Sequence, residues 1–551
     1  MPKIKNLKDG ITKHILINAV EHDGKAAVGP VLGRVMAEYP ELRKDVHGTK
    51  QLIEKEIKKI NRLSQNTQKE MLEKLGYEKT EKKERCELKD LPNVGKKFVV
   101  RFAPNPDGAL TLGNARPAIL CDEYAKRYKG KFILRFDDTD PKVKVPEKRF
   151  YDWIREDLKW LGININKEII SSARLDIYYR YAEKLVKSGN AYVCTCNGEK
   201  WKKMRDSGKP CRCRDLPAKK HVQRWKKMLS NEFKEGMAVL RIKTDVKHPN
   251  LAVRDFPAMR IVDKPRHPLV KAKLWPLYNF ASAIDDHALG VTHILRGQEH
   301  STNEVKQRYI YDYFGWKYPV VALLGRFSLM DMVLSKSKSR RGIAEKEFSG
   351  WDDPKLGTLR ALRRRGFQAK AIRKLIIDIG LKPNDITITQ ENLAGYNKKI
   401  IDPIANRYFF VSEPLKIKIK NLDIKQKKIK LHPTIERGFR NFKLGKYFFI
   451  EKNDFKKFKG KEVRLKDLCN IKLGKVSELT GYELKSIPKI QWVPADEKTN
   501  VAVIMPDKTI KGYGEKSMEK LKVGDIIQME RFGFGRVDET GKGIVVVFAH
   551  K

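Results

Sequence analysis

The sequence predicts a multidomain protein in which an α/β domain with a parallel sheet is followed by helical and all-β parts. The chain has 551 residues, more than one hydrophobic core supports. Strand and helix patterns alternate between residues 97 and 170, and this order is typical of a parallel sheet. Beyond about residue 405, short strand patterns with glycine turns predict one or two β-barrels.

Each segment of the chain has its own pattern. The first is helical and charge-rich, the third interrupts the α/β pattern with a cysteine cluster, and the fifth is helical and basic. We therefore expect six segments: 1–95 (helical), 96–171 (first half of the α/β domain), 172–275 (insertion), 276–341 (second half of the α/β domain), 342–404 (helical) and 405–551 (β-barrels). The expected strands include 98–102, 131–136 and 293–296, and the expected helices include 115–128, 150–161 and a basic one near 219–234.

The charge balance indicates a polyanionic partner. Lys and Arg number 116 against 68 Asp and Glu, which gives a net charge of +48 spread over most of the chain. An excess of this size favours nucleic acid over a merely solvated surface or a membrane surface. Neither a secretory leader nor an apolar run of the ~18 residues needed to span a bilayer is visible. We therefore expect a cytoplasmic protein that does not bind a membrane.

A short Pro- and Gly-rich segment, residues 104–113, lies between a predicted strand and a predicted helix. Alone it is compatible with an ordinary βα turn. The functional interpretation places a nucleoside triphosphate over the helix N-terminus, where free amides and the helix dipole attract phosphate. Thr111 and Asn114 would then donate hydrogen bonds to phosphate oxygens.

A second segment, VLSKSK at residues 333–338, is rich in Lys and Ser. One interpretation is a solvated basic loop. The other is a mobile loop whose Lys336 and Lys338 close on the pyrophosphate group as its charge develops. Together the two segments would hold a triphosphate from two sides.

The pair resembles the two signature motifs of class I aminoacyl-tRNA synthetases. TLGN at 111–114 stands where that family has His-Ile-Gly-His, and VLSKS at 333–337 stands where it has Lys-Met-Ser-Lys-Ser. Further sequences that resemble the glutamyl/glutaminyl branch are RFAPNP (101–106), LRFDDTDP (134–141), WPLYNF (275–280), GVTHILRG (290–297), LRALRRRG (359–366) and IDPIANR (401–407). With its N-terminal helical segment and β tail, the chain is similar to archaeal glutamyl-tRNA synthetases.

The resemblance implies a Rossmann-type catalytic domain with an inserted acceptor-binding domain, a helical stem-contact domain and anticodon-binding β-barrels. It implies ATP-dependent attachment of L-glutamate to tRNA(Glu) through a glutamyl-adenylate, with Mg²⁺; tRNA(Gln) as a second substrate stays open. The implied catalytic residues are Lys336, Thr111 and Asn114, and the implied ATP-binding residues are Pro104, Gly113, Ser335, Lys336, Lys338 and Glu299.

The chain departs from the family motifs at three positions. Thr111 and Asn114 replace both histidines of the first motif, and each can donate a hydrogen bond but carry no charge. Val333 replaces the first lysine of the second motif. Lys336 is therefore the remaining cation of that motif.

The choice between glutamate and glutamine rests on the amino-acid pocket. A pocket for glutamate is expected to offer a guanidinium, which pairs with a carboxylate through two hydrogen bonds. By resemblance, the pocket residues are Arg101 near the substrate side chain, Asp137 on the α-ammonium, Tyr278 and Arg296. Glutamyl enzymes resemble this chain in having arginine at position 296, which favours glutamate. The alternative for Arg296 is a surface ion pair with Glu299.

Four cysteines form two Cys-x-Cys pairs in the predicted insertion. They are Cys194, Cys196, Cys211 and Cys213. Such paired spacing favours a closed, structural Zn²⁺ site over four unrelated thiols, and four thiolates leave no position for a substrate. We expect Cys86, Cys121 and Cys469 to be ordinary core or surface residues.

Three alternatives to a glutamate ligase stay open at this point. A glutaminyl-tRNA synthetase is disfavoured by Arg296. A divergent paralogue that modifies a tRNA base would resemble only the catalytic half. A non-catalytic tRNA-binding protein is disfavoured by Lys336, Asp137 and Arg101.

Overall fold

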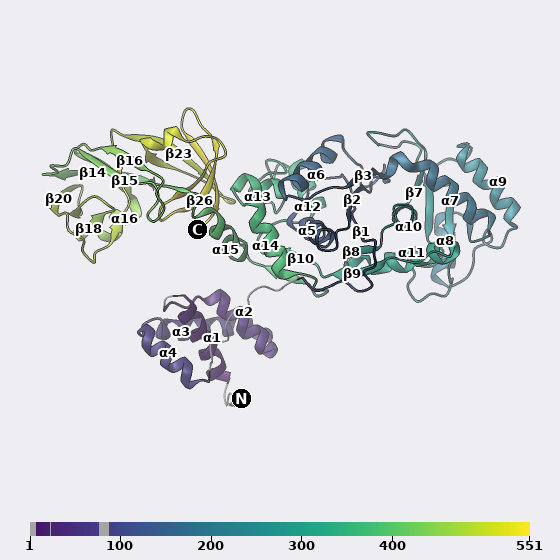
Figure 1. Ribbon diagram of the computed structural model, residues 1–551, viewed down its shortest axis with the longest axis horizontal. Helices are drawn as coiled ribbons and strands as arrows, with labels where there is room; N and C mark the ends of the chain where they lie inside the picture. Colours follow the sequence, from purple (N-terminus) through teal and green to yellow (C-terminus); the bar gives the residue numbers. More distant parts are fainter. Residues whose placement is uncertain (1–6, 23, 77–87) are drawn as a thin grey trace. The chain divides into compact units, whose positions relative to one another are not determined.

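The computed structural model describes residues 7–22, 24–76 and 88–551 (Figure 1). The chain divides into two compact units, residues 1–85 and 86–551. Cys86 and its neighbours in the charge-rich first segment, residues 77–87, lie outside the described residues. No described helix is long and apolar enough to cross a membrane.

The first unit is a small helical domain, as expected from its apolar spacing. Its helices are α1 (Leu7–Glu21), α2 (Val28–Glu38), α3 (Val46–Ile60) and α4 (Gln65–Lys74), with a 3₁₀ turn at Pro40–Asp45. Ile15, Leu16 and Val31 are completely buried in its core. Asp45 and Ser64 begin α3 and α4 by accepting hydrogen bonds from backbone amides of the first turn.

A parallel five-stranded sheet forms the centre of the second unit, which confirms the predicted α/β domain. The strand order is β3 (Lys167–Ile170), β2 (Lys131–Phe136), β1 (Val99–Phe102), β8 (His293–Gly297) and β9 (Val320–Leu324). The intervening helices are α5 (Leu112–Arg127), α6 (Lys148–Trp160) and α11 (Ser301–Phe314). β1 and β2 are almost continuously apolar and buried, as expected of strands covered on both faces.

The insertion between β3 and β8 contains an antiparallel sheet with the strand order β4 (Ala191–Cys194), β5 (Val239–Ile242), β6 (Pro257–Ile261) and β7 (Leu274–Pro276). Its helices are α7 (Leu175–Lys187), α8 (Gly198–Asp206) and α9 (Ala218–Leu229), and α10 (Tyr278–Ala288) follows β7. The predicted basic helix ends at Leu229 rather than near 234. Asn231 has a left-handed φ of 59°, which ends the helix.

The helical segment after the α/β domain shares the core of the parallel sheet. β10 (Phe327–Leu329) pairs with β11 (Ile386–Ile388), and the helices are α12 (Lys336–Ala344), α13 (Leu359–Arg365), α14 (Ala369–Ile379) and α15 (Gln390–Ile401). Leu359, Leu362 and Leu375 are buried in the same apolar cluster as strands β1 and β2. This shared core fixes the position of α13 beside the sheet.

The C-terminal part consists of strands apart from the short helix α16 (Lys452–Phe458) and a 3₁₀ turn at Lys516–Lys520, so its expected all-β character is confirmed. Its closure into barrels stays a prediction. One seven-stranded sheet contains β21 (Lys489–Ile490), β18 (Glu462–Leu465), β19 (Asn470–Lys472), β20 (Val476–Gly481), β14 (Pro414–Lys420), β17 (Tyr447–Glu451) and β22 (Val493–Pro494). The other contains β12 (Asn406–Tyr408), β25 (Ile526–Met529), β26 (Gly533–Glu539), β27 (Ile544–His550), β23 (Lys498–Ile504), β24 (Thr509–Glu515) and β13 (Phe410–Ser412), and β15 (Gln426–Lys430) pairs with β16 (Phe439–Lys443). The second sheet therefore combines the two ends of this segment.

Candidate active site

A cavity of about 620 Å³ opens at the carboxyl ends of β1 and β8. These neighbouring strands are separated in sequence by β2, β3 and the insertion, so the strand order reverses between them. Open α/β sheets bind ligands at such a switch point. The sequence-predicted residues that line the cavity are Arg101, Thr111, Gly113, Asn114, Tyr278, Arg296, Glu299, Ser335 and Lys338. Pro104, Asp137 and Lys336 are not among its lining residues.

The first motif begins helix α5 three residues earlier than the sequence predicts. The amide Oδ1 of Asn114 accepts hydrogen bonds from the Thr111 backbone N–H and from the Thr111 hydroxyl, both at 3.1 Å. This local cap explains why the helix starts at Leu112. The Thr111 hydroxyl thus donates to Asn114, and the Asn114 amide nitrogen is the side-chain donor of this pair that remains for a ligand.

A short extended segment joins the two motifs. The Leu112 N–H donates to the Gly357 carbonyl at 2.9 Å, and the Gly357 N–H donates to the Val333 carbonyl at 2.9 Å. The first amide of α5 is therefore already occupied and is not free for a phosphate. The segment positions the two motifs on opposite sides of one cavity.

The lysine-serine segment is not the loop that the sequence predicts, because helix α12 begins at Lys336. Ser335 caps this helix by accepting a 3.4 Å hydrogen bond from the Lys338 amide. Ser335 and Lys338 line the cavity. Lys336 instead donates to the Asn105 carbonyl at 3.0 Å and lies 3.5 Å from the Asp107 carboxylate. Burial lowers the Lys336 pKa, and Asp107 opposes this effect.

The other end of the cavity is surrounded by buried charges. Arg101 is 5 % exposed and pairs with Asp286 at 3.2 Å. Asp286 also accepts a 2.6 Å bond from Arg135, which in turn binds Asp137 at 2.7 Å. Burial raises the Asp137 pKa, although Arg135 and Arg101 oppose this shift. Arg101 is therefore compensated by a carboxylate, and Asp137 is held by a neighbouring guanidinium.

Arg296 differs from Arg101 in its partners. It is 5 % exposed, and both terminal nitrogens donate to the Gln307 amide oxygen at 3.1 Å. A 3.4 Å contact to the Tyr318 hydroxyl completes its hydrogen bonds, and its Nε has no partner. Across residues 7–22, 24–76 and 88–551, no carboxylate lies within 4.0 Å of this guanidinium, so the alternative of a surface pair with Glu299 is wrong.

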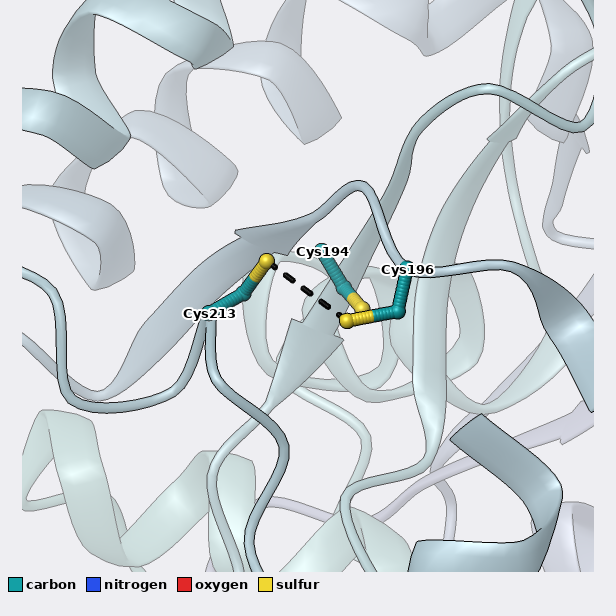
Figure 2. A group of neighbouring side chains, drawn as sticks. All are labelled: Cys194, Cys196 and Cys213. Carbon is teal, nitrogen blue, oxygen red and sulfur yellow. Dashed lines mark hydrogen bonds between the residues drawn. The ribbon is translucent and has the colours of Figure 1, made fainter. Parts of the chain in front are cut away.

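The four cysteines of the insertion come together at the end of β4, and Figure 2 shows three of them, Cys194, Cys196 and Cys213. The sulfurs of Cys194 and Cys211 are 3.8 Å apart, as are those of Cys196 and Cys213. Cys194, Cys196 and Cys213 all lie within 4.8 Å of one another. Neighbouring donors, which include the Thr195 amide and Arg224, lower the pKa of Cys213 despite its burial. The surroundings therefore favour a thiolate at Cys213, whereas the hydrogen bond with Cys211 and burial raise the pKa of Cys194.

Comparison with known proteins gives the family. Residues 97–403 match the catalytic domain of "tRNA synthetases class I (E and Q)", and residues 405–486 and 489–538 match two anticodon-binding domains of the same class. The chain belongs to this family. Curated glutamate–tRNA ligases from Pyrococcus furiosus, Pyrococcus abyssi and Thermococcus kodakarensis are 51 %, 52 % and 50 % identical; the alignments cover 98 %, 98 % and 100 % of this chain and 99 %, 99 % and 100 % of those proteins.

A solved glutamate–tRNA synthetase from Elizabethkingia anophelis is 22 % identical, with a TM-score of 0.42 over 56 % of this chain and 72 % of that one. The anticodon-binding matches extend the resemblance of this class I synthetase beyond its catalytic half. A paralogue that resembles the catalytic half alone is therefore excluded.

Sequence reasoning missed several residues of the synthetase site. Asp286 on α10 compensates two arginines, and its only signal in the sequence is the adjacent pair of acids, Asp285 and Asp286, in this helix. Gln307 lies at the middle of α11 and is recognisable only through its contact with Arg296. His300 and Arg326 also line the cavity, and burial lowers the His300 pKa. None of these residues has a local motif.

Proposed function

We propose that the chain attaches L-glutamate to tRNA in an ATP-dependent reaction. The observation that carries this proposal is the buried Arg296, whose partners are neutral. A desolvated guanidinium without a counter-ion favours an anionic ligand, and glutamate differs from glutamine by that one charge. The full-length relatives named glutamate–tRNA ligase support the same substrate.

The reaction proceeds in two steps. The glutamate α-carboxylate attacks the α-phosphorus of Mg·ATP, which forms glutamyl-adenylate and releases pyrophosphate. The 2′-hydroxyl of the terminal tRNA adenosine then attacks the acyl carbon, and AMP leaves. Both steps develop negative charge on groups that lie between the first motif and α12, where preorganised donors and cations lower the barrier.

Individual roles follow from the positions of the side chains. Asn114 and Gly113 would contact phosphate at the start of α5, while Ser335 and Lys338 would contact it from the opposite wall. Lys336 would reach the leaving pyrophosphate after it exchanges the Asn105 carbonyl for phosphate oxygens. Pro104 positions the first loop because its carbonyl accepts from the Asp137 amide at 3.1 Å, and Glu299 at the cavity wall would contact the nucleotide or its Mg²⁺.

The amino-acid end would use a second set of groups. Arg296 would bind the γ-carboxylate of glutamate, with Arg101 and Tyr278 lining the same pocket. Asp137 would hold the α-ammonium of glutamate. Its carboxylate already pairs with Arg135, so it would face the substrate beside that arginine. The guanidiniums of Arg101, Arg135 and Arg174 pair with the carboxylates of Asp137, Asp285 and Asp286, whereas Arg296 has no paired carboxylate among the described residues. The side-chain carboxylate of glutamate would balance this cluster.

The cysteine cluster fits a structural Zn²⁺ ion. A tetrahedral ion with Zn–S bonds of about 2.3 Å has its sulfurs about 3.8 Å apart. The sulfurs of Cys194 and Cys211 have this separation, and so do the sulfurs of Cys196 and Cys213. The ion would tie the loop after β4 to the loop before α9 and supply no step of the reaction.

The remaining segments would bind tRNA. We assign the acceptor end to the insertion, the stem to residues 342–404 and the anticodon to the C-terminal sheets; the anticodon-binding matches and the net charge of +48 support tRNA as the partner. The glutaminyl alternative is disfavoured, because neutral glutamine would leave Arg296 without a counter-ion. Whether tRNA(Gln) is charged besides tRNA(Glu) depends on the bases that the anticodon domain accepts.

ATP–pyrophosphate exchange tests the proposal. Exchange should depend on glutamate and, by resemblance to this branch, on tRNA. Labelled glutamate should then appear on tRNA(Glu). A protein that binds tRNA(Glu) but gives neither exchange nor aminoacylation would be a non-catalytic binder, which would overturn the proposal.

A further inference from the structure

We propose that Gln307 is a positioning residue that sets amino-acid specificity: its neutral amide orients Arg296 without compensating its charge. This inference rests on the proposed role of Arg296 in binding glutamate. Gln307 does not line the cavity and therefore acts through the arginine. The hydrogen bonds around the buried amide oxygen of Gln307 support this role.

The Gln307 Oε1 atom accepts three hydrogen bonds. Two come from the terminal nitrogens of Arg296 at 3.1 Å, and the third comes from the Tyr318 hydroxyl at 2.7 Å. Gln307 is completely buried on α11, and its Nε2 has no partner. The three donors identify the atom that faces them as the carbonyl oxygen, because an NH₂ group in its place would oppose three donors.

These hydrogen bonds fix the orientation of the Arg296 guanidinium. The Gln307 Oε1 atom accepts from both terminal nitrogens of Arg296. The Tyr318 hydroxyl donates to the same oxygen and so holds it in place. Arg308 also lies over the Tyr318 ring, at 4.5 Å from its centre. The guanidinium is therefore preorganised for a ligand, so that little side-chain freedom is lost when glutamate binds.

The same hydrogen bonds leave the positive charge of Arg296 without a paired carboxylate. Arg101 and Arg135 share the carboxylate of Asp286, whereas Arg296 has an amide, a phenol and an Nε with no partner. A carboxylate at position 307 would form a two-oxygen pair with Arg296 and remove its need for an anionic ligand. The neutral residue at this position thus keeps the pocket selective for an acid.

Gln307→Glu tests the charge with almost no change in shape. The ratio of kcat/KM for glutamate to kcat/KM for glutamine in tRNA aminoacylation should fall by about 100-fold. This is the change expected when hydrogen bonding to a charged group is lost. The stabilising shift in Tm on adding glutamate should disappear. Without substrate, the variant should unfold at the same temperature as the wild type or higher, because a buried cation gains a counter-ion.

Gln307→Met is the matched control, because it removes the acceptor and adds no charge. It should lower kcat/KM for glutamate yet keep the glutamate-over-glutamine ratio within about 10-fold of wild type. If Gln307→Met lowers the ratio as much as Gln307→Glu, shape rather than charge is responsible and the proposal is overturned. An unchanged ratio in Gln307→Glu, or a variant less stable than wild type, would also overturn it.

Arg296→Met in the same assays separates this inference from the proposed function. A ratio that Arg296→Met leaves unchanged contradicts the role of Arg296 itself. A ratio that falls in Arg296→Met but not in Gln307→Glu contradicts only the role of Gln307.

Discussion

The ammonium of Lys336 donates a 3.0 Å hydrogen bond to the carbonyl oxygen of Asn105, so the second motif rests on the loop that leads into the first. The phosphate cavity is lined by Ser335 and Lys338 instead. In the proposed reaction, Lys336 would exchange the Asn105 carbonyl for phosphate oxygens. Its contribution therefore belongs to the transition state more than to the initial binding of ATP.

Lys336→Ala should accordingly lower kcat by about 100-fold or more and raise the KM for ATP much less. Lys338→Ala is the matched control on the same helix turn, and its main effect should be on KM because Lys338 already lines the cavity. Steady-state aminoacylation at varied ATP concentrations measures both constants. An unchanged kcat with a raised KM in Lys336→Ala would identify Lys336 as a ground-state binder.

Asp107→Asn should make the reaction more sensitive to alkaline pH. Burial lowers the Lys336 pKa, and the Asp107 carboxylate opposes this shift. Without the carboxylate the Lys336 pKa falls further, and its charged form is lost as pH rises through that pKa. The alkaline limb of the kcat/KM profile, which reports the free enzyme, should move to lower pH. A limb that stays in place would show that Lys336 does not control it.

The cysteine site should hold one equivalent of Zn²⁺ in freshly purified protein. Cys211→Ser should abolish most of this zinc and lower the Tm, because the loops around β4 and α9 lose their common ion. Cys469→Ser is the control, since this buried thiol lies directly before β19 in the apolar core of the C-terminal part and should leave the zinc content unchanged. Elemental analysis that finds less than about half an equivalent in the wild type would contradict the assignment.

The buried Asp157 on α6 should lower the free energy of unfolding at neutral and alkaline pH. It is 1 % exposed with an unpartnered Oδ2, and burial raises its pKa from the usual 3.8 to about 7. The folded state therefore binds a proton that the unfolded state has lost, and stability falls as pH rises from about 4 to 7.

Asp157→Asn, which cannot ionise, should add about 1–3 kcal/mol to the free energy of unfolding at pH 8 and less than half as much at pH 5, where the folded state still holds the proton. Denaturant titration at the two pH values measures this difference. Equal effects at both pH values would show that Asp157 is not a buried ionising group.

Much of the fold is predictable because local patterns determine it. The buried strands β1 and β2 are nearly continuous apolar runs, and β2 has the predicted bounds, 131–136. Two parts could not be predicted. The lysine-serine segment is helical because the Ser335 side chain caps it, and the second C-terminal sheet unites β12 and β13 with strands β23 to β27. Both depend on contacts that no local pattern records.

The candidate site was predictable where side chains follow the ends of strands. Arg101 and Arg296 lie at the ends of β1 and β8, and both line the cavity. The charge balance around them was not predictable, since Asp286 and Gln307 come from helices α10 and α11. Whether a buried arginine is compensated depends on which of these groups it meets in three dimensions.

The most direct test of the account compares glutamate with glutamine in aminoacylation of tRNA(Glu) by the wild type and by Arg296→Ala. The wild type should prefer glutamate by roughly 10⁴-fold or more in kcat/KM, because glutamine leaves a buried guanidinium without a counter-ion. Arg296→Ala should lose most glutamate activity and shift the ratio toward glutamine. A wild type that prefers glutamine, or a ratio that the substitution leaves unchanged, would contradict the account.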